Sequence, residues 1–296
     1  MAGGKLQQII VTVPRPLEPA FTMHLRSLVG QWPTSWTPAE NGRAEISLFL
    51  PAHRGSAKLL RSVRAFSDIL KHLGLATGPI RLRRRVIRTK DWARAWRNSF
   101  EPVEISPTLV VKPTWAKWPE HDGQVVIEID PTLAFGTGHH PTTAFCLRMI
   151  ERQKAKEPLS FLDCGCGTGI LAIAAARLNY SPIIGIDFDR QAVRVARGNL
   201  KRNGVERQVK IVRCALEKFS MSGKHDVVTA NLATDTLIKN ARRLTRLVRP
   251  GGTLVLAGVL DRYARRVSSV FRALGWRRVA GESAGGWTSW AMRRLT

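Results

Sequence analysis

Apolar and polar residues follow two different periods along the first ninety residues. Alternation predicts a strand over 44–50, and a run rich in β-branched residues predicts a strand over 6–13. The basic, imperfectly alternating run over 80–87 is interpreted as a final strand. Helical spacing is found over 17–29 and 57–73. With a short strand near Trp36, the order becomes β-α-β-β-α-β, the ferredoxin-like arrangement. A small α+β module of this kind implies no function by itself.

The remaining two thirds of the chain alternate regularly between apolar strands and amphipathic helices. Strands are expected over 125–129, 159–162, 182–186, 209–213, 226–232, 253–259, 276–280 and 287–293. Helices are expected from 144, and over 170–177, 191–203, 236–248 and 263–274. Such alternation requires a mostly parallel, doubly wound α/β sheet, and ligands bind such sheets at the carboxyl ends of the strands.

The pattern divides the chain into two domains and a connector. We expect a small α+β domain over 1–88, a linker over 89–120 and the doubly wound domain over 121–296. Within the linker, residues 91–96 are expected to form a short helix that pairs Trp92 with Trp96. We interpret these two rings as aromatic packing between domains rather than as a ligand contact.

Composition limits the class of protein without naming it. The chain has 296 residues, 44% of them hydrophobic, and no apolar run reaches the roughly 18 residues that span a bilayer. The first residues lack the apolar core of a signal peptide. Of the four cysteines, Cys164 and Cys166 lie together without a second pair at zinc spacing, so we expect no metal and no disulfide framework. We therefore predict a cytoplasmic, monomeric protein without membrane contact.

The net charge of +25 is the unusual bulk property. One interpretation is a polyanionic partner such as RNA, because clustered cations release counterions when they bind phosphates. The other is a lineage that favours arginine, since arginine is spread over both halves of the chain. We favour the second interpretation, and expect at most nonspecific RNA contact. The densest basic run, residues 81–88, is predicted to be a strand with a solvated edge.

A glycine-rich turn is the most informative local pattern. Gly165, Gly167 and Gly169 follow an apolar strand and precede an alanine-rich helix, so the backbone can turn tightly and approach a ligand. Asp187 ends the next strand, at the interval where nucleoside-binding folds place the carboxylate that holds a ribose. Strand, turn, helix, strand and acid in this register predict a nucleoside cofactor.

The spacing of the turn favours one cofactor over another. Dinucleotide enzymes use G-x-G-x-x-G, whereas this turn is G-x-G-x-G with Asp163 two residues before its first glycine. A carboxylate beside a pyrophosphate is repelled, but beside the cationic sulfonium and amino group of S-adenosylmethionine it is favourable. We therefore prefer S-adenosylmethionine to NAD, with Asp163, Gly165, Gly167 and Asp187 as cofactor-binding residues.

Two further polar side chains are candidates for the same site. Asn231 ends a buried strand, and its carbonyl oxygen is suited to orient an incoming amine; the alternative is a turn residue at a strand end. Thr143 lies near a helix start, where a hydroxyl either caps backbone amides or meets a ligand. His140 precedes a proline, and we interpret it as a loop hydrogen-bonding group rather than a catalytic base.

The sequence resembles the PrmA family, bacterial enzymes that methylate the stalk-base protein L-eleven of the large ribosomal subunit. The specific segment is D-P-T-L-A-F-G-T-G-H-H-P-T-T at 130–143, which resembles that family's D-P-G-L-A-F-G-T-G-T-H-P-T-T. Segments 162–174, 185–189, 203–204, 230–232 and 249–252 also resemble it. The glycine turn is shared by many class I methyltransferases. The resemblance covers nearly all of 90–296 and is weaker before that.

The resemblance implies a substrate-recognition module, a linker and a class I methyltransferase domain. It implies transfer of methyl groups to lysine side-chain and N-terminal amines, and it matches Thr143, Gly165, Asp187 and Asn231 to the family's cofactor-binding residues. Three positions depart from the pattern: Thr132 replaces glycine, His139 replaces threonine, and N-L-A at 231–233 replaces N-I-L. The first two place the substrate in more doubt than the cofactor.

The sequence is compatible with three functions. The leading one is an S-adenosylmethionine-dependent protein-lysine N-methyltransferase with Asn231 as its catalytic residue and a ribosomal protein as substrate. An RNA methyltransferase is supported only by the charge and the basic strand. A catalytically silent RNA-binding or ribosome-assembly factor is opposed by the intact set of Asp163, Gly165, Gly167 and Asp187 with Asn231.

Overall fold

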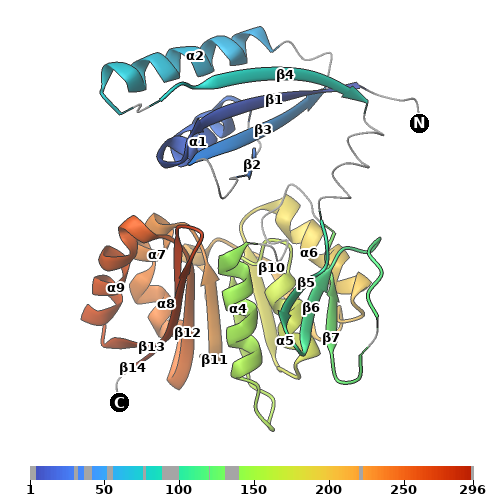
Figure 1. The fold of residues 1–296 in the computed structure, drawn as a ribbon. Coiled ribbons are helices and arrows are strands. Elements are labelled where there is room, and N and C mark those ends of the chain that lie inside the picture. The colour runs from blue at the N-terminus through green and yellow to red at the C-terminus, as the bar shows by residue number, and fades with distance from the viewer. Residues whose placement is uncertain are drawn as a thin grey trace. The chain divides into compact units, whose positions relative to one another are not determined.

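The computed structural model describes residues 5–29, 33–36, 42–51, 56–75, 78–88, 100–119, 121–130, 140–219 and 223–294. The chain folds into two compact units, residues 1–99 and 100–296 (Figure 1). The expected short helix over 91–96 lies outside the described residues. None of the described helices is both long and apolar enough to cross a membrane.

The first unit has the expected ferredoxin-like order. Its elements are β1 (Lys5–Pro14), the 3-10 helix η1 (Arg15–Leu17), α1 (Glu18–Val29), β2 (Thr34–Trp36), β3 (Arg43–Pro51), α2 (Ala57–His72) and β4 (Arg81–Arg88). The sheet order is β2-β3-β1-β4, and the pairs β1–β3, β1–β4 and β2–β3 are antiparallel. Ile9 and Val11 of β1 pack with Phe21 and Val63 of the two helices, so one face of the sheet carries the core.

The second unit is built on a seven-stranded sheet among the described residues. The strands are β8 (Phe161–Cys164), β9 (Ile183–Asp187), β10 (Val209–Arg213), β11 (His225–Asn231), β12 (Val248–Leu260), β13 (Trp276–Ala284) and β14 (Trp287–Arg294). Their order is β10-β9-β8-β11-β12-β14-β13. Neighbours are parallel except β14, which is antiparallel to both β12 and β13, so the expected mostly parallel sheet is confirmed.

Helices cover both faces of this sheet (Figure 1). They are α4 (Pro141–Arg152), α5 (Ile170–Arg177), α6 (Arg190–Arg202), α7 (Thr234–Lys239), α8 (Ala241–Leu247) and α9 (Ala264–Ala273), with 3-10 turns η2 (Leu216–Lys218) and η3 (Asp261–Tyr263). One core joins α4, α5 and α6 to the sheet, and a second joins α7, α8 and α9 to its other face. The doubly wound architecture follows from this separation.

One predicted helix is two helices. The expected helix over 236–248 is α7 and α8, which meet at Asn240, and its last residue, Val248, already begins β12. The Asn240 amide Nδ2 donates to the Thr236 carbonyl at 3.0 Å and to Glu217 Oε1 at 3.2 Å. A short polar side chain that bonds the backbone in this way competes with helix continuation, which periodicity alone does not reveal.

The structure also moves the end of the expected linker. Residues 103–112 are folded: β5 (Val103–Ser106) and β6 (Leu109–Lys112) form a three-stranded sheet with β7 (Val125–Glu128). Leu109, Val110 and Val111 are buried, and Leu109 and Val111 belong to the core shared with α4 and α5. The described part of the expected linker therefore belongs to the second unit, because these side chains need that core.

We predict that the boundary near residue 100 decides whether the second unit folds alone. A fragment of 100–296 should unfold in one cooperative transition in urea, monitored by circular dichroism. A fragment of 121–296 lacks β5 and β6, so it should be less stable by several kcal/mol, since each buried apolar side chain contributes about 1.5–3 kcal/mol. Equal urea midpoints for the two fragments would show that β5 and β6 are not part of the folded unit.

Candidate functional site

The expected site residues gather at the carboxyl ends of three adjacent strands, β9, β8 and β11. The turn after β8 is bound to the end of β9, because the amides of Gly165 and Cys166 donate to the Ile186 carbonyl at 2.8 and 2.9 Å. Asn231 is the last residue of β11, which pairs with β8. The sheet topology therefore brings together residues that lie far apart in sequence.

The glycines of the turn are required by backbone conformation and by space. Gly165, Gly167 and Gly169 all have positive φ, at +78°, +52° and +80°. A Cβ on Gly165 would lie 2.4 Å from Leu232 Cδ2. The turn is thus held closely against the residue that follows Asn231, and any larger side chain at Gly165 would displace it.

The Asp187 carboxylate holds the turn and still has acceptor capacity. Its Oδ2 accepts from the Gly167 amide at 3.0 Å, and its Oδ1 accepts from the Asp189 amide at 2.9 Å. A carboxylate has about four lone-pair directions, so these two bonds leave others open. The side chain is 9% exposed. Asp187 is thus a fixed acceptor with room for hydroxyl donors.

Asp163 is the most deeply buried acid of the site, with 1% of its surface exposed. Its Oδ1 accepts from Thr229 Oγ1 at 2.8 Å, while its Oδ2 has no hydrogen-bond partner among the described residues. Burial raises the pKa of Asp163 to about 7, the Thr229 hydrogen bond opposes this, and the negative charge of Asp187 adds to it. A cation placed near this carboxylate would relieve both the burial cost and the charge repulsion.

Thr143 and Asn231 meet although 88 residues separate them. Asn231 Nδ2 donates to Thr143 Oγ1 at 3.4 Å, a long hydrogen bond. Asn231 Oδ1 is buried and has no partner among the described residues. Because an unpaired buried acceptor costs about 1–3 kcal/mol, this oxygen is suited to receive a donor from a ligand.

The sequence left open whether Thr143 caps the start of α4 or faces a ligand. His140 is the N-cap residue, and its Nδ1 accepts from the Thr142 amide at 3.4 Å. Its ring packs edge-on against Trp287, with centroids 5.0 Å apart. Burial lowers the pKa of His140 to about 4, which keeps the ring neutral. His140 therefore caps the helix, and the Thr143 hydroxyl lies against Asn231 instead.

Two residues near the site were not singled out in the sequence. Gly258 lies in a bulge of β12 with φ +82°, and a Cβ there would be 2.5 Å from the Leu232 carbonyl oxygen and 3.1 Å from Asn231 Oδ1. Thr229 binds Asp163 from inside a buried strand. The sequence signal for Gly258 was a lone glycine inside a strand pattern, which indicates a bulge or a close approach of another backbone. The signal for Thr229 was a hydroxyl side chain inside an apolar run.

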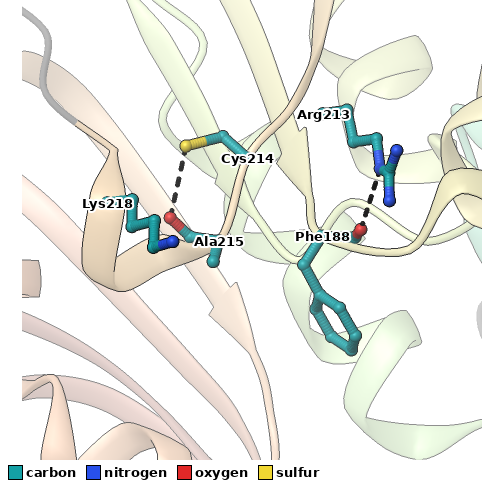
Figure 2. A pocket seen from close by; sticks show the side chains of 5 residues that line it. All are labelled: Phe188, Arg213, Cys214, Ala215 and Lys218. Atoms are coloured by element: carbon teal, nitrogen blue, oxygen red, sulfur yellow. Dashed lines mark hydrogen bonds between the residues drawn. The ribbon is translucent and has the colours of Figure 1, made fainter.

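A pocket of about 360 Å³ opens beside Asp187. Figure 2 shows its lining residues, which lie at or after the ends of β9 and β10: Phe188, Arg213, Cys214, Ala215 and Lys218. Arg213 Nε donates to the Phe188 carbonyl at 3.3 Å, and the Cys214 amide donates to the Asp187 carbonyl at 2.9 Å. The Phe188 side chain is 71% exposed, so it offers a free aromatic face.

The cysteines of the turn are packing residues. Cys164 and Cys166 are buried, all four cysteines are free thiols, and burial raises the pKa of both turn thiols, so they stay protonated. Among the described residues, no cluster of three acidic, histidine or cysteine side chains is arranged to hold a metal ion. Thr132 and His139, which depart from the PrmA pattern, lie outside the described residues.

The strand order and the site define a class I methyltransferase fold, and comparison with known proteins gives the family. The family model "Ribosomal protein L11 methyltransferase (PrmA)" matches residues 35–295. The chain therefore belongs to the PrmA family. A solved L11 methylase from Lactobacillus delbrueckii subsp. bulgaricus aligns with a TM-score of 0.62 at 26% identity, covering 67% of this chain and all of that one.

Curated relatives of this family match to different extents. The ribosomal protein L11 methyltransferase of Pelotomaculum thermopropionicum is 34% identical over 265 residues, which is 89% of this chain and 83% of that protein. The one from Citrifermentans bemidjiense is 43% identical over 194 residues, 64% of this chain, and the match spans 63% of its length.

The burial of Asp163 predicts a pH-dependent stability. With a folded pKa of about 7 and an ordinary value of 3.8, the native state binds more protons than the unfolded state between these values. The contribution of Asp163 is therefore fully present below pH 3.8 and is lost as pH rises through about 7. Asp163→Asn has the same shape and stays neutral. The free energy of unfolding of Asp163→Asn, minus that of the wild type, should therefore rise by on the order of a few kcal/mol between pH 4 and 8.

Urea unfolding of both proteins at several pH values measures this difference, and other titrating groups cancel in the subtraction. Parallel pH profiles would mean that Asp163 is ionised normally in the folded protein.

Proposed function

We propose that this protein transfers methyl groups from S-adenosylmethionine to lysine side-chain and N-terminal amines of ribosomal protein L11, in the cytoplasm. Membership of the PrmA family supports the substrate, and the names of its relatives say that they are L11 methyltransferases. The observation that carries the chemistry is the buried Asn231 Oδ1, which has no partner among the described residues and lies at the edge of a nucleoside-binding turn.

The residues present fit S-adenosylmethionine. Two acceptor positions of the Asp187 carboxylate already hold the Gly167 and Asp189 amides. The ribose hydroxyls would donate to its remaining lone pairs. The adenine base would then enter the adjoining pocket against Phe188. Gly165 lets the cofactor approach the backbone, and Asp163 supplies negative charge near the sulfonium and amino groups.

NAD fits the same residues less well. A pyrophosphate at this turn would bring its negative charge near Asp163 and Asp187. Burial already raises the pKa of Asp163, and the negative charge of Asp187 adds to that effect. A cationic ligand reverses that interaction, because an opposite charge nearby favours the ionised carboxylate. Electrostatics therefore supports the sulfonium cofactor.

The amine must reach the methyl carbon unprotonated and aligned. When bound, S-adenosylmethionine supplies a methyl group already activated by positive charge. Thr143 holds the amide of Asn231 through Nδ2, which leaves Oδ1 to accept a hydrogen from the incoming amine. One acceptor orients a neutral amine without the charge that would stabilise an ammonium ion. Positioning of this kind supplies about 7–11 kcal/mol of barrier reduction.

The first unit is proposed as the recognition module for the protein substrate. It contains none of Thr143, Asp163, Gly165, Gly167, Asp187 or Asn231, which all belong to the second unit. An RNA methyltransferase remains the competing enzyme, since the net charge of +25 suits RNA, and a silent assembly factor would bind cofactor without transfer.

Labelled S-adenosylmethionine separates these functions. The full chain should label purified L11 on amines, and RNase should leave the labelling intact. Asp187→Ala should weaken cofactor binding by about 10- to 100-fold in calorimetry, as expected for the loss of a charge-assisted hydrogen bond. Asp189→Ala is the matched control: its Oδ1 accepts from the Gln191 amide at the start of α6, so only that cap is lost.

Label in RNA, or labelling abolished by RNase, would favour the RNA enzyme. Cofactor binding without label in L11 or RNA would favour the silent factor. Tighter binding of NAD than of S-adenosylmethionine would overturn the cofactor assignment.

Gly258 is predicted to hold Asn231 in place. A Cβ in Gly258→Ala would press on the Leu232 carbonyl and on Asn231 Oδ1, so kcat should fall about 10- to 100-fold through misalignment. Gly251→Ala is the matched control, because Gly251 lies in the same strand with φ +76° and nothing within 4 Å of its added Cβ. Both variants should be assayed below their melting temperatures. Equal kcat values for the two would show that only backbone strain matters.

A further inference from the structure

The basic run of β4 is divided between the two faces of its sheet. Strand residues alternate in direction, and the register of β4 against β1 assigns each arginine to a side. Arg84 pairs with Ile9 and Leu82 with Val11, and both partners are core residues that pack against the helices. Arg81, Arg83 and Arg85 pair with Thr12, Ile10 and Gln8, so they lie on the face away from α1 and α2.

These three arginines, here called the arginine row, are exposed. None of them forms an ion pair with a described acid. The acid on this face of β3 is Glu45, which pairs with Thr12 and so lies level with Arg81 rather than with Arg83 or Arg85. The row is therefore a line of positive charge along the sheet.

The position of the row leaves its side chains accessible along the strand. In the order β2-β3-β1-β4, β4 is an edge strand. On the same face its neighbour β1 contributes the partly exposed Gln8 and Thr12 and, between them, the buried Ile10. Alternate residues of a strand are about 6.6 Å apart. Consecutive phosphates of an extended polynucleotide are separated by a similar distance, so the row can contact one phosphate with each guanidinium.

We propose that the arginine row binds the phosphate backbone of single-stranded RNA. Arginine presents a planar set of donors that suits phosphate oxygens. A basic ribosomal protein would be repelled by this row, so it is not the surface for the protein substrate. The choice of RNA among polyanions rests on the proposed function, because a ribosomal protein is encountered beside ribosomal RNA. Recognition of phosphates alone would make this binding independent of sequence.

The test is fluorescence anisotropy of a labelled 20-nucleotide oligouridine with the full chain at several salt concentrations. Arg83→Gln/Arg85→Gln should weaken binding at least about fivefold and lower the log–log salt slope by about 1.4, since each phosphate contact on a single strand contributes about 0.7. The matched control is Arg61→Gln/Arg64→Gln, which removes the same charge from exposed positions of α2 on the helical side. Arg84→Gln is the neighbour on the opposite face. Both controls should retain nearly the wild-type slope.

An equal loss in the α2 control would show that net charge, not the row, attracts RNA. Absence of measurable binding, or displacement of the oligouridine by polyglutamate as effectively as by unlabelled RNA, would also overturn the proposal. Methylation of isolated L11 by Arg83→Gln/Arg85→Gln should match wild type, so this binding assay and the transfer assay fail independently.

Discussion

The site depends on the contact between the Asp187 carboxylate and the Gly167 amide. This hydrogen bond joins the end of β9 to the turn after β8, and the Gly165 and Cys166 amides reinforce it by donating to the Ile186 carbonyl. The same carboxylate is the proposed ribose acceptor, so the interaction that shapes the turn would also orient the ligand. A rigid acceptor of this kind loses little entropy when a ligand binds.

Two buried acceptors set the polarity of the candidate site. Asp163 Oδ2 and Asn231 Oδ1 have no hydrogen-bond partner among the described residues. Buried acceptors without donors are costly in the free protein, and a ligand that supplies positive charge or N–H groups recovers that cost. Negative or acceptor-rich ligands do not. This polarity supports the proposed cationic cofactor beside Asp163 and the proposed neutral amine beside Asn231.

The first unit separates its core from its charge by the pleat of its sheet. Even-numbered residues of β3 are buried against the helices, and the others are partly exposed, except the exposed Pro51 at its end. Because successive side chains of a strand point to opposite faces, the basic run in β4 divides into Arg84 on one side and the arginine row on the other. An arginine-rich composition alone would give no such row, because its geometry comes from strand pairing.

The sequence by itself determined the fold class, the order of elements and the glycine-rich turn. These depend on local periodicity and on glycine spacing, which a chain carries without its tertiary contacts. Periodicity did not predict the helix break at Asn240, which a side-chain hydrogen bond decides. It also did not predict the strands within 103–112, which depend on a core formed with residues far along the chain. Thr143 and Asn231 were both singled out, but their contact was not foreseen. Only the tertiary structure brought Gly258 to Asn231 and Thr229 to Asp163, because sheet pairing sets distances between residues far apart in sequence.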